Sequence, residues 1–186
     1  MFKKIGVEAL LSQSISDINN AQKLLLPGVG SFDYGMKMLN ESGYVDALNK
    51  RVLEEKVPLL GICLGMQLMT KRSDEGQSKG LGWFDAETVK FNLDTHIYKI
   101  PHMGWNEVQS TRENALFKDM FDEPRFYFVH SYHVQTNNTA DILLKAHYGY
   151  DFVCGLQKNN IYGAQFHPEK SHKYGMKLLK NFAEYC

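Results

Sequence analysis

Residues 57–70 read Val-Pro-Leu-Leu-Gly-Ile-Cys-Leu-Gly-Met-Gln-Leu-Met-Thr, and this stretch decides the fold. An apolar run leads into a Gly-x-Cys-x-Gly turn centred on Cys63, and a second apolar run follows the turn. A nucleophile at a sharp strand-to-helix turn has a strained backbone, and small residues on either side, here Gly61 and Gly65, allow the turn to close. The stretch predicts a buried strand, a nucleophilic cysteine at its end, and then a helix.

The first half of the chain alternates short apolar runs with a helical pattern. One apolar run, residues 23–26, ends in Pro27-Gly28-Val29-Gly30. A helical pattern covers residues 32–55, and the next apolar run covers residues 57–63. A connection of this length that contains a helix normally joins parallel strands. We therefore expect an α/β fold, with a sheet flanked by helices.

The second half is richer in strand patterns and ends in a helix. No repeat or low-complexity linker divides the chain, so we expect one domain over residues 1–186. Two polar segments, 74–79 and 135–141, are expected to be surface loops. The expected strands lie at residues 86–91, 107–109, 126–129, 142–146, 152–157 and 161–165, and the closing helix lies at residues 174–185.

Charge, hydropathy and cysteine usage limit the possible partners. The 21 basic and 21 acidic residues cancel, so the chain has no basic stripe that would favour nucleic acid or anionic lipid. No run approaches the roughly 18 apolar residues of a membrane-spanning helix, and residues 1–6 lack the apolar core of a signal peptide. Three cysteines, far apart in sequence, fit a reducing compartment. We expect a cytoplasmic protein that binds neither nucleic acid nor membrane.

Cys63 has the setting of a nucleophile. A sulfur at the first turn of a helix lies near free N–H groups and the positive end of the helix dipole, which favours the thiolate. The backbone N–H of Leu64, directly after it, would form half of an oxyanion hole. An isolated cysteine in an apolar run can equally be a small buried hydrophobic residue, so this stretch alone leaves both interpretations open.

His167-Pro168-Glu169 provides a base and a carboxylate to orient it. Proline biases the residue before it to extended geometry, so the side chains of His167 and Glu169 fall on the same side of the chain. The carboxylate can then bond one ring nitrogen while the other faces the nucleophile. A local surface hydrogen bond is the simpler alternative. We expect no metal, because the remaining histidines show no ligand spacing: His96, His102, His130, His133, His147 and His172.

Three motifs in this order resemble the signatures of class I glutamine amidotransferases: residues 27–30, residues 61–67 and residues 166–169. Within that family the chain is most similar to the glutaminase subunit of imidazole glycerol phosphate synthase, on the evidence of residues 101–106, 128–132 and 167–171. The resemblance implies a flavodoxin-like α/β sheet with a β-rich second half. It also implies hydrolysis of glutamine to glutamate and ammonia through a cysteine thioester, without a cofactor or metal.

The resemblance also implies roles for individual residues. The ammonia would pass to a (β/α)₈-barrel synthase subunit, the heterodimer partner, which makes imidazole glycerol phosphate and AICAR in histidine biosynthesis. The family further suggests that hydrolysis is slow until the partner binds. The implied roles are catalysis for Cys63, His167 and Glu169; an oxyanion hole for Gly28, Val29 and Leu64; glutamine binding for Gln67, His130, Ser131 and Tyr132; and a partner interface for Trp105, Tyr127 and Lys170.

The chain departs from the family pattern in two places. Family members usually begin with an apolar strand followed by Asp-Tyr-Gly-x-Gly-Asn, whereas residues 1–6 here resemble the end of the next helix, so we expect one βα unit upstream. If that strand lies inside the sheet, its absence leaves neighbouring strands with unpaired backbone groups. Residues 172–177 and 80–83 resemble a paralogous branch that supplies ammonia for amidating surface-polysaccharide sugars. The acceptor of the ammonia therefore stays open.

Two other classes of protein remain as alternatives. A binding module could keep the fold and lose the chemistry, although all three catalytic positions are occupied by the expected residues. A cysteine peptidase or another acyl hydrolase could use the same nucleophile on a related scaffold. Gln67 and the segment 130–132 favour glutamine as the substrate, through the resemblance alone.

Overall fold

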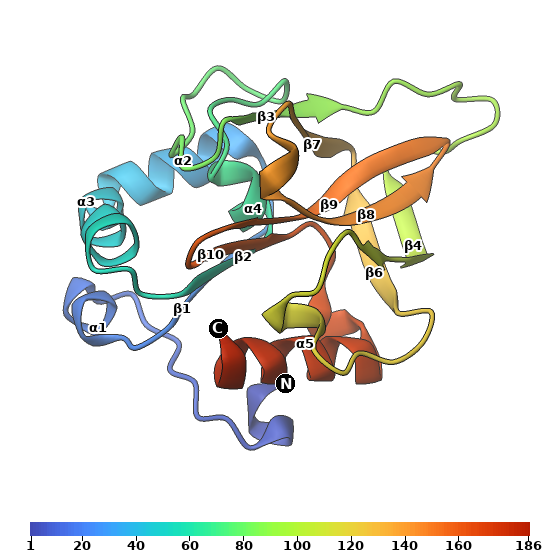
Figure 1. Ribbon diagram of the computed structural model, residues 1–186. Helices are drawn as coiled ribbons and strands as arrows, with labels where there is room; N and C mark the ends of the chain where they lie inside the picture. Colours follow the sequence, from blue (N-terminus) through green and yellow to red (C-terminus); the bar gives the residue numbers. More distant parts are fainter.

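The computed structural model describes residues 1–186 and shows a curled mixed sheet with helices on both faces (Figure 1). The main path of the sheet runs β1-β2-β10-β9-β7-β3, and β8 and β5 extend it beside β9. A separate ribbon of two strands, β4 and β6, lies next to it. The expected α/β class with a β-rich second half is confirmed.

Three parallel strands form the half of the sheet that carries the cysteine. Strand β2 (Leu59–Cys63) lies between β1 (Leu24–Gly28) and β10 (Ile161–Ala164) and is parallel to both. In this register Gly28 lies beside Cys63 at the carboxyl ends of the strands. The chain leaves β10 at the same edge toward His167. The parallel sheet therefore brings all three sequence motifs to the edge at which open α/β sheets bind ligands.

The remaining strands are antiparallel. Strands β8 and β9 form a long hairpin, β9 pairs with β10 and β7, and β4 pairs only with β6. Their bounds are β3 Ala86–Lys90, β4 His102–Glu107, β5 Gln109–Ser110, β6 Arg125–His130, β7 Tyr132–Thr136, β8 Ile142–Tyr148 and β9 Tyr150–Lys158.

Helices α2 and α4 lie on one face of the parallel strands, and α5 lies on the other (Figure 1). The apolar sides of α2 and α4 contribute Phe32, Met36 and Leu68 to one buried cluster. The other cluster contains Leu178 and Phe182 of α5. The helical bounds are α1 Ile15–Asn20, α2 Phe32–Glu41, α3 Tyr44–Asn49, α4 Leu64–Leu68 and α5 His172–Tyr185, with short turns η1 Phe2–Ile5, η2 Lys50–Glu54, η3 Ala115–Phe117, η4 Thr139–Asp141 and η5 Pro168–Lys170.

The single helix expected over residues 32–55 is wrong. The helical pattern breaks at Gly43, which has a φ of +68° and lies directly before the first turn of α3. Glycine adopts this left-handed backbone without steric conflict, so the chain turns there and continues as α3 and the π-helical turn η2. The closing helix is confirmed, and it begins two residues earlier than expected, at His172.

Two strand boundaries also differ from the expectation. The strand expected at residues 107–109 runs instead from His102 to Glu107, and β5 follows as a separate strand. The sequence of β4 contains a glycine and a mixture of polar and aromatic side chains, which give a weak strand pattern. Pairing with β6 therefore determines that these residues form a strand. The loop expected at residues 135–141 begins inside β7 and ends in η4. The loop expected at residues 74–79 contains no helix or strand.

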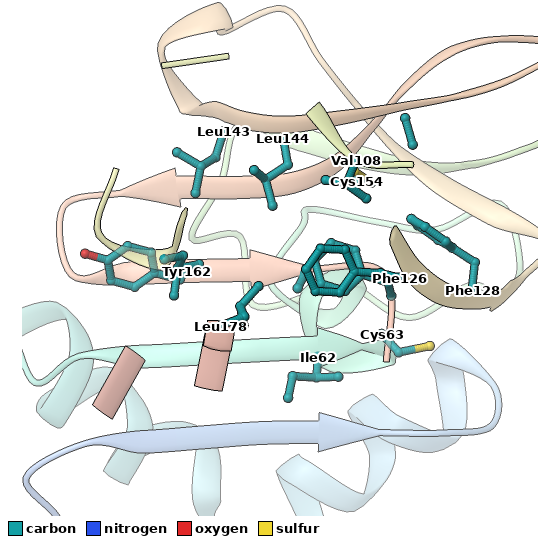
Figure 2. Packing of buried hydrophobic residues seen from close by; sticks show 14 of the residues in the cluster. Ile62, Cys63, Val108, Phe126, Phe128, Leu143, Leu144, Cys154, Tyr162 and Leu178 are labelled. Atoms are coloured by element: carbon teal, nitrogen blue, oxygen red, sulfur yellow. The ribbon is translucent and has the colours of Figure 1, made fainter. Parts of the chain in front are cut away.

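The core around β2 fixes the end of the strand. Figure 2 shows Cys63 at the carboxyl end of β2, with its sulfur pointing beyond the strand and away from the packed side chains of Ile62 and Leu178. Above it, the ring of Phe126 from β6 stacks on Phe166 with a distance of 4.0 Å between ring centroids. This contact packs the segment before His167 against the β4–β6 ribbon.

The first strand of the described chain is an edge strand. Strand β1 pairs with β2 on one side only. Residues 7–13 form neither helix nor strand, and the side chains of Leu10 and Leu11 are exposed. Strands β1 and β2 pair directly over their whole length, so no gap separates them. None of the helices is both long enough and apolar enough to cross a membrane.

Candidate active site

The backbone at Cys63 has the strained geometry of a strand-to-helix turn. Its φ is +54° and its ψ is −113°, in a region of backbone angles that residues other than glycine rarely adopt. A Cβ on Gly61 would lie 2.8 Å from the carbonyl oxygen of Gly65. A Cβ on Gly65 would lie 1.8 Å from the carbonyl oxygen of Leu26 on β1. Both glycines are therefore required for α4 to begin directly against the sheet.

Three hydrogen bonds hold His167 against the β4–β6 ribbon. Its backbone N–H donates to the carbonyl of Tyr127 over 2.9 Å. The hydroxyl of Ser171 accepts from the N–H of Tyr127 over 3.0 Å and donates to the carbonyl of His167 over 2.6 Å. His167 is 4% exposed, so its position is set by the residues packed around it.

The imidazole of His167 is bonded on one nitrogen and free on the other. Nδ1 lies 2.7 Å from Oε1 of Glu169, as the spacing of the two residues predicts. Nε2 is buried and has no protein hydrogen-bond partner. The same cavity wall contains His167 and Cys63, so the free nitrogen and the sulfur serve one site.

The charges at this site reinforce one another. The interaction with Cys63, followed by the bond to Glu169, raises the pKa of His167 from 6.5 to about 9. Desolvation is the largest single effect on Glu169 and would raise its pKa. The hydrogen bonds from His167 and from its own backbone N–H, together with the charges of His167 and Lys170, outweigh it, and the net pKa is lowered. The histidine is therefore held as an imidazolium between a sulfur and a carboxylate near neutral pH.

The site opens into a cavity of about 370 Å³ at the carboxyl edge of the sheet. Its walls come from the turn after β1, the start of α4, the loop after α4, the β4–β6 ribbon and the segment after β10. The lining residues are Val29, Gly30, Cys63, Leu64, Gln67, Glu75, Pro101, Val129, His130, Ser131, Tyr132, His167 and Lys170.

The structure brings most of the expected site residues to this cavity. The four residues expected to bind glutamine, Gln67 and the segment 130–132, all line it. Of the residues expected to form the oxyanion hole, Val29 and Leu64 line it, whereas Gly28 lies at the end of β1 and packs on Leu64. Glu169 lies behind His167 and does not line the cavity.

The residues expected at a partner interface gather beside the cavity mouth. Trp105 and Tyr127 are opposite each other on β4 and β6, with ring centroids 6.3 Å apart. The ammonium of Lys170 lies 5.7 Å from the ring centroid of Tyr127, and His172 stacks on Trp105 at 5.4 Å. The side chain of Trp105 is 47% exposed, so the ring presents apolar surface to solvent. We call these four residues the aromatic cluster.

Two cavity-side residues were missed from the sequence. Glu75 lies in the loop expected to be only a solvated connection, yet its Oε2 accepts from the N–H of Phe32 over 2.8 Å and its side chain lines the cavity. Gln165 is fully buried, and its Nε2 lies 3.8 Å from the sulfur of Cys63. A charged loop gave no signal for Glu75, but the position of Gln165 two residues before His167 could have drawn attention to it.

A cysteine on a strained turn and a charged histidine that lines the same cavity define a class of α/β enzymes with a thiol nucleophile. Solved structures share the fold: a glutamine amidotransferase aligns with a TM-score of 0.74 at 19% identity, over 98% of this chain and 88% of that one. The glutaminase domain of Trypanosoma brucei CTPS aligns with a TM-score of 0.59 at 14% identity, over 91% and 74%.

The sequence pattern of the class I glutamine amidotransferase family matches residues 4–185, and the chain belongs to this family. Subunit HisH 2 of imidazole glycerol phosphate synthase from Methanococcus maripaludis is 53% identical over 98% of this chain and 90% of its own. The HisH 2 subunit from Pseudomonas aeruginosa is 47% identical over 99% and 91%. HisH 1 from the same Methanococcus strain is 45% identical over 90% and 82%.

Proposed function

We propose that this chain is the glutaminase subunit of imidazole glycerol phosphate synthase, with Cys63, His167 and Glu169 as its catalytic residues. The observation that carries the proposal is the shared cavity, which is lined by Cys63 at the strained turn and by His167, whose Nε2 has no hydrogen-bond partner in the protein. The high identity to synthase subunits along nearly the whole chain supports the assignment.

The first half of the reaction releases ammonia. The thiolate of Cys63 attacks the side-chain amide carbon of glutamine and forms a tetrahedral intermediate, whose oxyanion is stabilised by N–H groups of Val29 and Leu64. The imidazolium of His167 donates its Nε2 proton to the leaving nitrogen. The C–N bond then breaks, ammonia departs, and the thioester remains. The pKa of about 9 favours this role, because His167 holds its proton at neutral pH.

The second half regenerates the enzyme. The neutral His167 now takes a proton from water, and the hydroxide attacks the thioester carbon. Collapse of this second tetrahedral intermediate breaks the C–S bond and returns the thiolate and glutamate. Glu169 keeps the imidazole oriented through both steps and stabilises its charged form, since its Oε1 lies 2.7 Å from Nδ1.

The cavity also supports recognition of glutamine as a free amino acid. Glu75 is its only carboxylate, and one of its oxygens is already bonded to the N-terminus of α2, so the other can accept from the substrate α-ammonium group. Gln67, Ser131 and Tyr132 supply polar groups around the same space. A residue inside a peptide chain has no free α-ammonium group to place at Glu75, which favours free glutamine over a peptide substrate.

The partner proposed for this subunit is a (β/α)₈-barrel synthase subunit, bound as a heterodimer over the aromatic cluster. An exposed tryptophan and a cavity-lining lysine that both contact Tyr127 have the composition of an interface centre. Ammonia would pass there without entering bulk solvent and would be used to make imidazole glycerol phosphate and AICAR in histidine biosynthesis. Three free cysteines support a cytoplasmic location.

A second acceptor is supported by a specific observation. Methanococcus maripaludis has two numbered relatives, and this chain is 53% identical to HisH 2 and 45% identical to HisH 1. A second copy in one organism allows a second acceptor, such as a surface-polysaccharide sugar. Glutamate release by the chain and each candidate barrel partner, measured with and without that partner's own acceptor, would separate the two cases. Stimulation only by the sugar substrate would overturn the histidine assignment.

The catalytic proposal is tested with Cys63→Ser and the matched control Cys154→Ser. Cys154 is a fully buried thiol outside the cavity, so its replacement should leave the rate of glutamate release nearly unchanged. Cys63→Ser should reduce that rate by at least about a thousandfold, because the thioester cannot form. Both variants should still bind the partner. Substantial glutamate release by Cys63→Ser would contradict the proposal.

A further inference from the structure

A chain of side-chain amides leads from the cavity wall to the nucleophile. Gln165 lies just after β10 and is fully buried, and its backbone N–H donates to the carbonyl of Cys154 over 2.9 Å. Its Oε1 lies 3.0 Å from Nε2 of Gln67. Its Nε2 lies 3.8 Å from the sulfur of Cys63, within the range of a hydrogen bond to sulfur.

The direction of these hydrogen bonds follows from one backbone carbonyl. The carbonyl oxygen of Tyr132 can only accept, and Gln67 lies 3.3 Å from it, so the atom that faces it is the donor Nε2. The same Nε2 faces Gln165, whose facing atom must then be the acceptor Oε1. The remaining Nε2 of Gln165 therefore points its N–H at Cys63.

We propose that Gln165 is a further catalytic residue, which donates a hydrogen bond to the sulfur of Cys63 and stabilises its thiolate. The proposal rests on the proposed function, since it concerns the same nucleophile. His167 and Gln165 act on the sulfur in different ways: His167 has a proton to transfer, whereas the amide of Gln165 keeps its hydrogens at every working pH.

The hydrogen bond has most effect where the sulfur carries negative charge. Hydrogen bonds to ionised acceptors are stronger than those to neutral groups, so the N–H of Gln165 favours the thiolate over both the thiol and the thioester. The hydrogen bond stabilises the thiolate of the resting enzyme. It also stabilises the thiolate that forms when the C–S bond breaks during hydrolysis of the thioester. The buried setting keeps water from replacing the amide.

The test measures the reactivity of Cys63 without glutamine or a partner, so its outcome does not depend on glutaminase activity. Iodoacetamide alkylation of Cys63 is followed by mass spectrometry between pH 6 and pH 10 in the full chain. In Gln165→Met, which has similar volume and no donor, alkylation at pH 7 should be about tenfold slower. In Gln165→Glu, which has the same shape, the carboxylate opposes the thiolate and the rate should fall further.

Two controls keep the result interpretable. Gln157→Met changes the same residue type on β9, away from the cavity, and should leave the rate unchanged. Cys154 is fully buried, so its alkylation marks unfolded molecules in any sample and allows them to be subtracted. An unchanged alkylation rate in folded Gln165→Met, or a faster rate in Gln165→Glu, would overturn the proposal.

A second measurement needs no change at Gln165. In the ¹⁵N-labelled protein, the side-chain amide signal of Gln165 should shift when Cys63 is alkylated or replaced by serine, while the Gln157 signal stays in place. A signal of Gln165 that ignores both changes would also overturn the proposal. If the alkylation effects hold while the wild-type chain with its partner releases no glutamate, the proposed function fails and the role of Gln165 toward the thiol stands.

Discussion

Two sets of buried histidines adjoin the cavity, and their pKa values move in opposite directions. The pKa of His167 rises to about 9, whereas burial lowers the pKa of His130 to about 3 and that of His102 to about 4. All three side chains are at most 6% exposed, so burial alone does not explain the difference. His167 has Cys63 and Glu169 as partners, and the other two have none with a negative charge. The charge of the neighbouring groups therefore determines the protonation state: His167 is protonated and can act as an acid, whereas His102 and His130 are neutral and have a structural role.

His102 and His130 form a neutral pair, and the groups at the two ends of the pair determine the direction of its hydrogen bonds. Asn106 accepts from the N–H of Glu107 and donates to the carbonyl of His147, so the atom 3.3 Å from His102 Nε2 is its donor amide. At the other end, Nδ1 of His130 must donate to the carbonyl of Tyr132 over 2.8 Å. Therefore Nδ1 of His102 donates to Nε2 of His130 over 2.9 Å.

The neutral pair supports the cavity without taking part in proton transfer. His130 donates to the same Tyr132 carbonyl that orients Gln67, and aromatic rings enclose His102, with Tyr148 stacked on it at 4.2 Å between centroids. A charge on either ring would break this directional chain. The comparison thus predicts catalytic effects at His167 and binding or stability effects at His102 and His130.

The largest expected effect comes from His167→Asn. Removal of the proton donor and acceptor should reduce the rate of glutamate release at saturating glutamine by roughly 10³- to 10⁴-fold. The melting temperature should fall because the charged ring no longer interacts with Cys63 and Glu169, but the protein should still fold, because the backbone contacts of this segment remain. His147→Asn, at an exposed histidine paired with Asp151, is the matched control and should keep full activity. A loss below tenfold in His167→Asn would contradict the acid role.

Glu169→Gln should be the milder lesion, because this residue orients the imidazole and contacts no reacting atom. We expect a loss of about 10- to 100-fold in kcat, with little change in KM. Loss of the carboxylate should also lower the pKa of His167, measured by NMR titration of the ring. A loss as large as that in His167→Asn, with an unchanged ring titration, would indicate a more direct role for Glu169.

His102→Phe should affect stability and binding more than turnover. The variant leaves Nε2 of His130 without its donor in a buried site, which costs about 1–3 kcal/mol of unfolding free energy in urea denaturation. With the support of Tyr132 weakened, KM for glutamine should rise while kcat stays within a few-fold of the wild-type value. A loss of kcat with unchanged KM would place His102 in the chemistry and remove the contrast with His167.

The sequence predicted the local geometry around Cys63 and His167, and it did not predict the contacts that distant strand pairing makes. Gly61 and Gly65 flank Cys63 closely enough for sterics to reveal the turn, and the proline between His167 and Glu169 fixes their relation locally. In contrast, His102 and His130 meet across two strands, and the first of these strands has too weak a pattern to be placed correctly.

Glu75 shows the same limitation in a loop. Its loop was correctly predicted to lack helix and strand, but the bond from the N-terminus of α2 that turns its carboxylate toward the cavity joins residues 43 positions apart. Gly43 is a second example: the sequence pattern placed it inside one helix over residues 32–55, whereas in the structure it separates α2 from α3. The position of Glu75 depends on a tertiary contact, which short-range spacing does not encode.

The smallest expected effect is the pH dependence of stability, and it has a different sign for each set of histidines. The folded pKa of His167 lies above its usual 6.5, so its contribution is fully present below pH 6.5 and is lost as the pH rises through about 9. The folded pKa values of His102 and His130 lie below 6.5, so their contribution is present above pH 6.5 and is lost as the pH falls toward 4 and 3.

The two pH dependences together predict maximum stability near pH 6.5. Variants at His167 and His102 can show which histidines cause the loss of stability on each side of this maximum. Urea midpoints measured from pH 4.5 to pH 9.5 should fall on both sides of this maximum in the wild-type protein. His167→Asn should flatten the alkaline side alone, because the group that loses its proton there is absent. His102→Phe should flatten part of the acid side, although it lowers the whole curve. If His167→Asn instead flattened the curve at low pH, His167 would not differ in charge from His102 and His130. The distinction between a catalytic His167 and a structural His102–His130 pair would then be wrong.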